Sequence, residues 1–167
     1  MENTRSPGVR PPDPGSPRAA AVYLLALRPL LGTLSGGRRA LLKSLRALAQ
    51  DARRGGPLYR ERALAVGNER LAFFQEARRQ FEAIEPPPPA QAIHAELAHW
   101  FDRMMAACNG IVAFGVGGQV ADLRRAQRYL EEAGEHAHAF NEEHRRLVAL
   151  MRGLVEDRRF RRRMVAR

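Results

Sequence analysis

The chain has 167 residues, the size of one ordinary domain, and 45% of them are apolar, which is enough for a hydrophobic core. Its 28 basic and 18 acidic residues give a formal net charge of +10, and every cation except Lys43 is an arginine. The single Cys108 excludes an internal disulfide and a cysteine-based metal cage. No uninterrupted apolar run reaches the length of a typical membrane-spanning helix. We expect a cytoplasmic protein, with an extracytoplasmic one as the alternative.

Composition favours helix almost everywhere, because Ala, Leu, Arg and Glu dominate and only 7% of the residues are aromatic. We therefore expect an all-α protein, a bundle of four or five helices with a long antiparallel hairpin at its C-terminal end. Residues 1–17 contain five prolines and no apolar periodicity, which predicts a disordered segment. Residues 18–157 then form one domain, and residues 158–167 form a basic C-terminal end.

The first helix should begin at about Pro17 or Arg18. Its apolar residues lie roughly along one side of the helical wheel: Val22, Leu25, Leu30 and Leu34. Pro29 is expected to kink this helix or to divide it, and Gly36 and Gly37 are expected to end it. A separate second helix follows, with apolar residues on one side: Leu41, Leu42, Leu45, Leu48, Ala49 and Ala52. Gly55, Gly56 and Pro57 end it.

A third helix is expected over about residues 58–85. Its apolar residues fall within one broad face: Tyr59, Ala63, Val66, Phe73, Phe74, Ala77, Phe81 and Ile84. Arg70 falls inside this face, so its guanidinium either reaches outward along its own stem or joins a buried ion pair. The four prolines Pro86 to Pro89 cannot continue the helix and predict a stiff, extended corner.

The rest of the chain reads as a helical hairpin, with a first arm over about residues 90–114. Its apolar residues recur every three or four positions: Ile93, Leu97, Trp100, Phe101, Met104, Cys108 and Ile111. A turn is expected at Gly115, Gly117 and Gly118, and a second arm from Val120 onward. That arm supplies the matching apolar residues: Leu123, Leu130, Ala137, Phe140, Val148, Met151 and Val155.

Several of these signals occur in one order along the chain: Tyr23-Leu24 with Leu27, Pro29-Leu30-Leu31, Phe81 and Ile84 before Pro86-Pro87, His94 before Leu97, and Leu123, Ala126 and Leu130 after the glycine turn. This order resembles a loose family of bacterial helical proteins with no assigned activity. In that family the pattern usually follows a signal peptide or a lipoprotein signal, which implies an extracytoplasmic location. This chain lacks a lipobox cysteine.

Two Glu-x-x-His pairs, Glu96 with His99 and Glu135 with His138, have the spacing of half a di-metal carboxylate site. On the helical wheel, however, Glu96 and His99 lie about 100° and about 160° from Leu97, the centre of their arm's apolar stripe. Ligands on outward faces do not converge on a bundle core. We therefore expect no metal site and no other cofactor, with a carboxylate and histidine metal-binding bundle as a third hypothesis.

Two other histidines, His94 and His144, lie nearest the apolar stripes. Hairpin geometry places them within about one helical turn of each other, so they either form a pH-sensitive contact or each cover an edge of the core. The glycines around Gly117 follow a helix rather than a strand, so they do not form a phosphate-binding loop. No nucleophile stands beside a histidine and an acid in a recognisable arrangement, and we expect no catalytic site.

Basic residues are concentrated at the C-terminal end of the chain, which indicates a candidate binding surface. Residues 158–167 carry six cations and no acid: Arg158, Arg159, Arg161, Arg162, Arg163 and Arg167. Such a cluster attracts phosphates or an anionic membrane surface, or it serves only as a solvated helix end that complements the helix dipole. We expect a non-catalytic helical interaction or scaffold protein with a protein partner. The alternative is an anion-binding protein that docks on nucleic acid or acidic membrane through these arginines.

Overall fold

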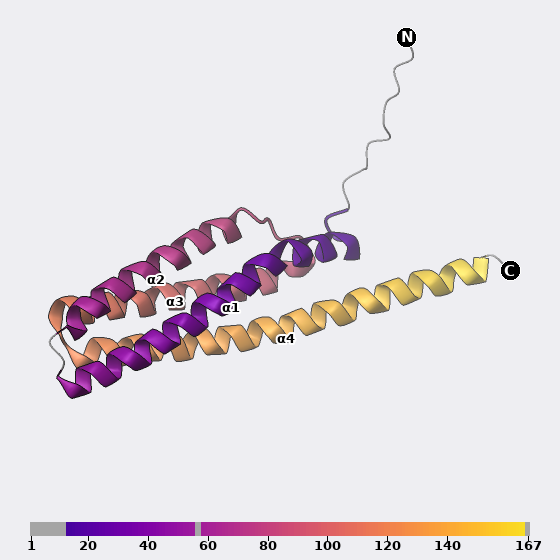
Figure 1. Ribbon diagram of the computed structural model, residues 1–167. Coiled ribbons are helices and arrows are strands. Elements are labelled where there is room, and N and C mark those ends of the chain that lie inside the picture. The colour runs from indigo at the N-terminus through magenta and orange to yellow at the C-terminus, as the bar shows by residue number, and fades with distance from the viewer. Residues whose placement is uncertain (1–12, 56–57, 166–167) are drawn as a thin grey trace, which may run out of the picture.

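The protein is a bundle of four α-helices in up-down-up-down order (Figure 1). The computed structural model describes residues 13–55 and 58–165, the last eight of these by backbone alone. Its helices are α1 (Pro17–Arg54), α2 (Tyr59–Glu82), α3 (Gln91–Gly117) and α4 (Val120–Val165), with a short 3-10 helix η1 (Pro88–Ala90) before α3. The prediction of an all-α bundle that ends in a long hairpin is confirmed. Residues 1–12, for which disorder was expected, lie outside the described part.

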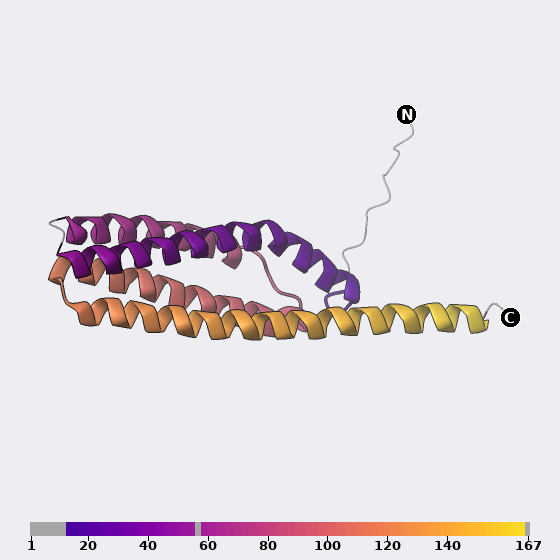
Figure 2. The same cartoon turned by 60° about the horizontal axis from the view of Figure 1, so that its bottom comes forward.

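Helix α1 is one unbroken helix, and the prediction of two helices divided at Gly36 and Gly37 is wrong. It begins at Pro17, where the Ser16 hydroxyl accepts a hydrogen bond from the Ala19 amide at 3.2 Å. It ends at Gly55, whose φ of 66° suits glycine. Pro29 is accommodated inside it, and Figure 2 shows the N-terminal part of α1 bending toward α4.

Gly37 stays helical because α2 comes close to α1 at this position. A Cβ on Gly37 would lie 2.2 Å from Cε1 of the Phe73 ring. The missing side chain leaves space for that ring, so packing against α2 compensates for the low helix propensity of glycine. Tertiary contact thus overrides the local signal that predicted a helix end.

The buried face of α1 also differs from the predicted one. Val22 and Leu25 are 54% and 65% exposed. Four predicted apolar residues of this helix are buried as expected: Leu30, Leu34, Leu41 and Leu48. Buried too are residues outside the predicted apolar faces: Ala20, Tyr23, Leu27 and Gly37. Two large apolar side chains of α1 therefore face solvent.

Helix α3 is the central helix, packed on α2 along one side and on α4 along the other. All seven residues of its predicted stripe are buried, from Ile93 to Ile111. The expected turn at Gly115 is wrong, because α3 continues through Gly117 and turns at Gly118, whose φ is 69°. Gly115 instead lies against α2, where an added Cβ would sit 2.8 Å from the Leu64 backbone nitrogen.

Helix α4 is much longer than its partner, with 46 residues against 27 in α3. At 1.5 Å per residue the difference is about 28 Å, and Figure 1 shows the C-terminal part of α4 extending past the bundle. Val155 was predicted for the core but is 44% exposed in this part of α4. Its neighbours Leu150 and Leu154 are also exposed, at 55% and 40%. The core of the hairpin therefore ends before α4 does.

Candidate functional site: the groove between α1 and α4

The bundle is least tightly closed between α1 and α4, which pack only lightly on each other. Three cavities follow one another along this seam, with volumes of about 430, 250 and 570 Å³. The first is lined by Arg38, Leu42, Leu45, Arg46 and Ala49 of α1 and by Gln127, Leu130, Glu131 and Gly134 of α4. The last is lined by Pro17, Arg18, Ala21, Val148, Met151, Arg152, Val155 and Glu156. We call the whole seam the α1–α4 groove.

The middle cavity of the α1–α4 groove reaches down to α3. Leu97 and Trp100 of α3 form its floor, and Trp100 remains 5% exposed. Its walls and rim come from the two outer helices: Leu31, Leu34, Ser35 and Arg38 of α1, and Ala137, Phe140 and Asn141 of α4. This combination of apolar walls and a polar rim suits an amphipathic ligand, because it buries one face and leaves the other in water.

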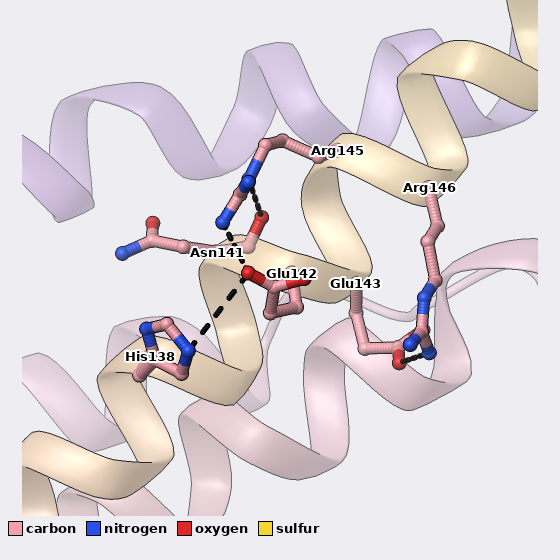
Figure 3. A network of polar contacts seen from close by, with 6 residues as sticks. All are labelled: His138, Asn141, Glu142, Glu143, Arg145 and Arg146. Atoms are coloured by element: carbon pink, nitrogen blue, oxygen red, sulfur yellow. Dashed lines mark hydrogen bonds and ion pairs between the residues drawn. The ribbon is translucent and has the colours of Figure 1, made fainter.

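The two walls of the groove differ in charge. Helix α1 carries eight cations and one acid, Asp51, whose carboxylate lies 2.7 Å from Arg62 of α2. On α4 the acids that line the groove are Glu131 and Glu156. Between them along the helix, Glu142 pairs with Arg145 and Glu143 pairs with Arg146 (Figure 3). The charged side chains that α1 contributes to the lining are all cations, Arg18, Arg38 and Arg46, so the groove has a positive wall on the α1 side.

Arg70, which the sequence placed inside the apolar face of α2, is an ion-paired arginine. Its Nη2 lies 3.0 Å from Oε1 of Glu69, which is itself 67% exposed, so the pair reaches solvent. Its Nε is buried and has no hydrogen-bond partner among the described residues. Arg70 lies outside the α1–α4 groove and contributes no charge to it.

His94 is anchored between three helices. Its Nδ1 lies 3.0 Å from the Tyr23 hydroxyl, and its ring stacks on Phe81 at a centroid distance of 4.1 Å. Burial lowers the pKa of His94, and Arg78 lowers it further, whereas Glu82 raises it. Burial also raises the pKa of the Tyr23 hydroxyl. Nδ1 of a neutral His94 can therefore accept a hydrogen bond from the Tyr23 hydroxyl.

His144 stays apart from His94. Its ring lies parallel to that of Phe140 one turn earlier on α4, at a centroid distance of 6.3 Å. Over the described ranges no hydrogen bond or ring contact joins the two histidines. Each covers a different edge of the core, which is the second of the two arrangements that the sequence allowed.

Glu96 contacts the partner arm, so the prediction that it lies on an outward face is wrong. Glu96 Oε2 lies 2.8 Å from Nδ1 of His136 on α4, and the rings of His99 and His136 are 5.2 Å apart. The sequence reading chose His138 instead, which lies 3.8 Å from Glu142 of its own helix and is 76% exposed. Within residues 13–55 and 58–165, no group of three or more His, Cys, Asp or Glu side chains is arranged to hold a metal ion.

The basic C-terminal end lies largely outside the described side chains. The backbone of α4 continues as a helix through Val165, so Arg158, Arg159, Arg161, Arg162 and Arg163 follow on the same helix, whereas Arg167 falls outside the described residues. The sequence indicated an anion-binding site at this end, and none of its predicted site residues lies in the groove. The signal that could have indicated it is the nearly uniform positive charge of residues 17–54.

Comparisons with known proteins add no relative: no protein family model, no curated protein and no solved structure matches the chain. By length and composition α1 is apolar enough to cross a membrane, and 28% of its most apolar 18-residue window is buried in the bundle. Buried core helices and signal sequences share these properties, so this finding alone assigns no location.

Proposed function

We propose that this protein is a non-catalytic helical interaction module that binds an acidic, amphipathic helix of a partner protein in the α1–α4 groove. The observation that carries the proposal is the middle cavity, where Trp100 and Leu97 lie at the base of an apolar groove beside the cationic α1. An amphipathic helix laid between two bundle helices buries its apolar face and keeps its polar face in water.

Charge complementarity selects an acidic partner. Arg38 borders both the middle and the first cavity, and Arg46 borders the first. A cationic helix would meet like charge along the α1 wall, which raises the cost of association. An acidic helix gains from the same wall, and the contact accelerates its encounter with the protein at low salt.

Trp100 provides a direct test, because it is the only tryptophan of the chain and lines the groove floor. The probe is a designed helical peptide of about five turns with leucines on one face and glutamates on the other. We expect titration of this peptide to shift the emission of Trp100, and a peptide with lysines in place of the glutamates to leave it unchanged.

Two variants separate the groove from general electrostatics. Arg38→Glu combined with Arg46→Glu should weaken acidic-peptide binding by at least about tenfold, because two favourable contacts become repulsive. The control is Arg53→Glu combined with Arg54→Glu, which makes the same change of charge at the exposed end of α1. Equal loss in both double variants, or no binding by the unaltered protein, would rule out the groove as a docking site.

A second candidate function is binding of a polyanion such as nucleic acid by the C-terminal end. The observation that favours it is that α4 continues as one helix past the bundle (Figure 1) and carries five arginines between residues 158 and 163. Binding to labelled duplex DNA should weaken steeply with salt, since each phosphate contact releases a counterion. A chain ending at Asp157 should lose this binding. Unchanged binding after truncation would leave the arginines as a solvated helix end.

A further inference from the structure

One solvent-facing side of α1 is apolar in its N-terminal half and positively charged in its C-terminal half. Taking 100° per residue, six exposed positions fall within about 80° of the helical wheel opposite the buried face. We call them the outer line of α1: Leu25, Pro29, Gly32, Gly36, Arg39 and Lys43. No acid lies on this line, and the only acid of α1, Asp51, pairs with Arg62.

The apolar half of this line exposes two large aliphatic side chains to solvent. Leu25 is 65% exposed, and its neighbour Val22 is 54% exposed. From residue 19 to residue 36 the only charged side chain is Arg28. The most apolar 18-residue window of α1 has a mean hydropathy of 1.4, yet 28% of it is buried in the bundle. Leu24 and Leu31 of this segment are partly buried against the core, so its large apolar side chains that remain exposed are Val22 and Leu25.

We propose that the outer line of α1 docks on an anionic phospholipid surface. Leu25 and Val22 enter the boundary between headgroups and acyl chains, and Arg39 and Lys43, about four to six turns further along the same helix, contact the lipid phosphates. An anionic bilayer is the occupant that matches both halves, because it offers hydrocarbon beside negative charge. A nucleic acid offers no such hydrocarbon, and an acidic protein helix fits the groove on another side of α1.

The first test uses the full chain and vesicles of phosphatidylcholine, with or without about one third phosphatidylglycerol. We expect co-sedimentation with the anionic vesicles and none with the neutral ones. Leu25→Glu should weaken binding by about tenfold or more, because it places a charge in the interface and repels anionic lipid. Arg39→Glu combined with Lys43→Glu should weaken vesicle binding at least as much. Loss of each cation should cost about fivefold in affinity, and repulsion between the new glutamates and the anionic lipid adds to this loss.

The matched control is Arg124→Glu combined with Arg128→Glu, two exposed arginines of α4 with the same change of charge. It should bind vesicles as the unaltered chain does. An equal loss in this control, or no binding of anionic vesicles by the full chain, would overturn the proposal. The peptide titration of the groove can fail without affecting this result, because Arg38 and Arg46 are intact in every one of these variants.

A second measurement distinguishes α1 from the arginines at the C-terminal end. Cys108 is buried, and burial raises its pKa to about 12, so it does not react with a thiol dye in the folded protein. A polarity-sensitive dye on Leu25→Cys should shift to the blue on anionic vesicles, and the same dye on Leu58→Cys, 52% exposed at the opposite end of the bundle, should not. Binding without a shift at position 25 would place the lipid contact elsewhere and disprove the proposal.

Discussion

The Tyr23 hydroxyl lies 3.0 Å from Nδ1 of His94, and this contact joins the first half of α1 to the start of α3. Because burial raises the pKa of Tyr23, its hydroxyl keeps its proton and can donate a hydrogen bond to Nδ1 of neutral His94. Protonation of His94 would turn Nδ1 into a donor, so the Tyr23 hydroxyl would have to rotate and accept, and it would place a charge on a partly buried ring.

Stability should therefore decrease in mild acid. The folded pKa of His94 lies below its unfolded value near 6.5, so the contribution of neutral His94 is complete above about 6.5 and is lost as the pH falls through the folded pKa. Thermal melts between about pH 7 and about pH 5 should show this fall, and His94→Gln should flatten it. The control is His138→Gln, on a side chain 76% exposed, which should keep the full slope. Identical slopes in all three proteins would contradict the role of His94.

Replacing two helical glycines, Gly115 and Gly36, by alanine should change the free energy of unfolding in opposite directions. Gly115→Ala places a Cβ 2.6 Å from Cγ and 2.8 Å from the backbone nitrogen of Leu64, so it should destabilise the fold by roughly 1–3 kcal/mol. Gly36→Ala meets nothing within 4 Å and should stabilise by about 0.5–1 kcal/mol through better helix propensity. Urea unfolding measures both changes. Stabilisation by Gly115→Ala would mean that α2 and α3 are further apart than described.

Trp100 should contribute strongly to the core although it also lines the groove. Its ring packs edge-on against Phe74 at 5.8 Å and Phe101 at 5.3 Å. Trp100→Ala should cost about 3–5 kcal/mol in unfolding free energy, and Trp100→Phe should cost markedly less because most of the volume stays filled. A melting temperature unchanged by Trp100→Ala would show that this part of α3 faces solvent or another chain.

Cys108 should react with thiol reagents only after unfolding. It is fully buried on α3, and burial raises its pKa to about 12, so both access and thiolate formation are suppressed in the native state. The reaction rate with Ellman's reagent should rise sharply across the urea transition and coincide with loss of helical signal. Fast labelling in native buffer would indicate an opening between α3 and its neighbours.

The hairpin of α3 and α4 could be predicted because its stripe is long and regular. From Ile93 to Ile111 every residue of the predicted stripe is buried, and the turn follows within three residues of the expected start. Periodicity alone fixes such an arm, since a sustained apolar face has to be covered.

Helix ends and polar contacts could not be predicted in the same way. Gly37 is a helix breaker by propensity, and only the Phe73 ring on the neighbouring helix makes it a packing position. Glu96 lies about 100° from its stripe centre, but the edge of a neighbouring helix reaches that far, so the angle did not exclude its contact with His136. The α1–α4 groove exists because two helices far apart in the sequence make few contacts with each other, and a local sequence pattern cannot predict this.

The light packing of α1 on α4 sets an order for local unfolding. Helices α2, α3 and α4 form a continuous three-helix unit around α3, whereas α1 lies at its edge and leans mainly on α2. Amide hydrogens of α1 should therefore exchange with solvent through a partial opening that leaves the other three helices intact. In that opened form Leu97 and Trp100 lose the cover of α1, so a ligand that holds α1 in place should slow its exchange before it raises the global melting temperature.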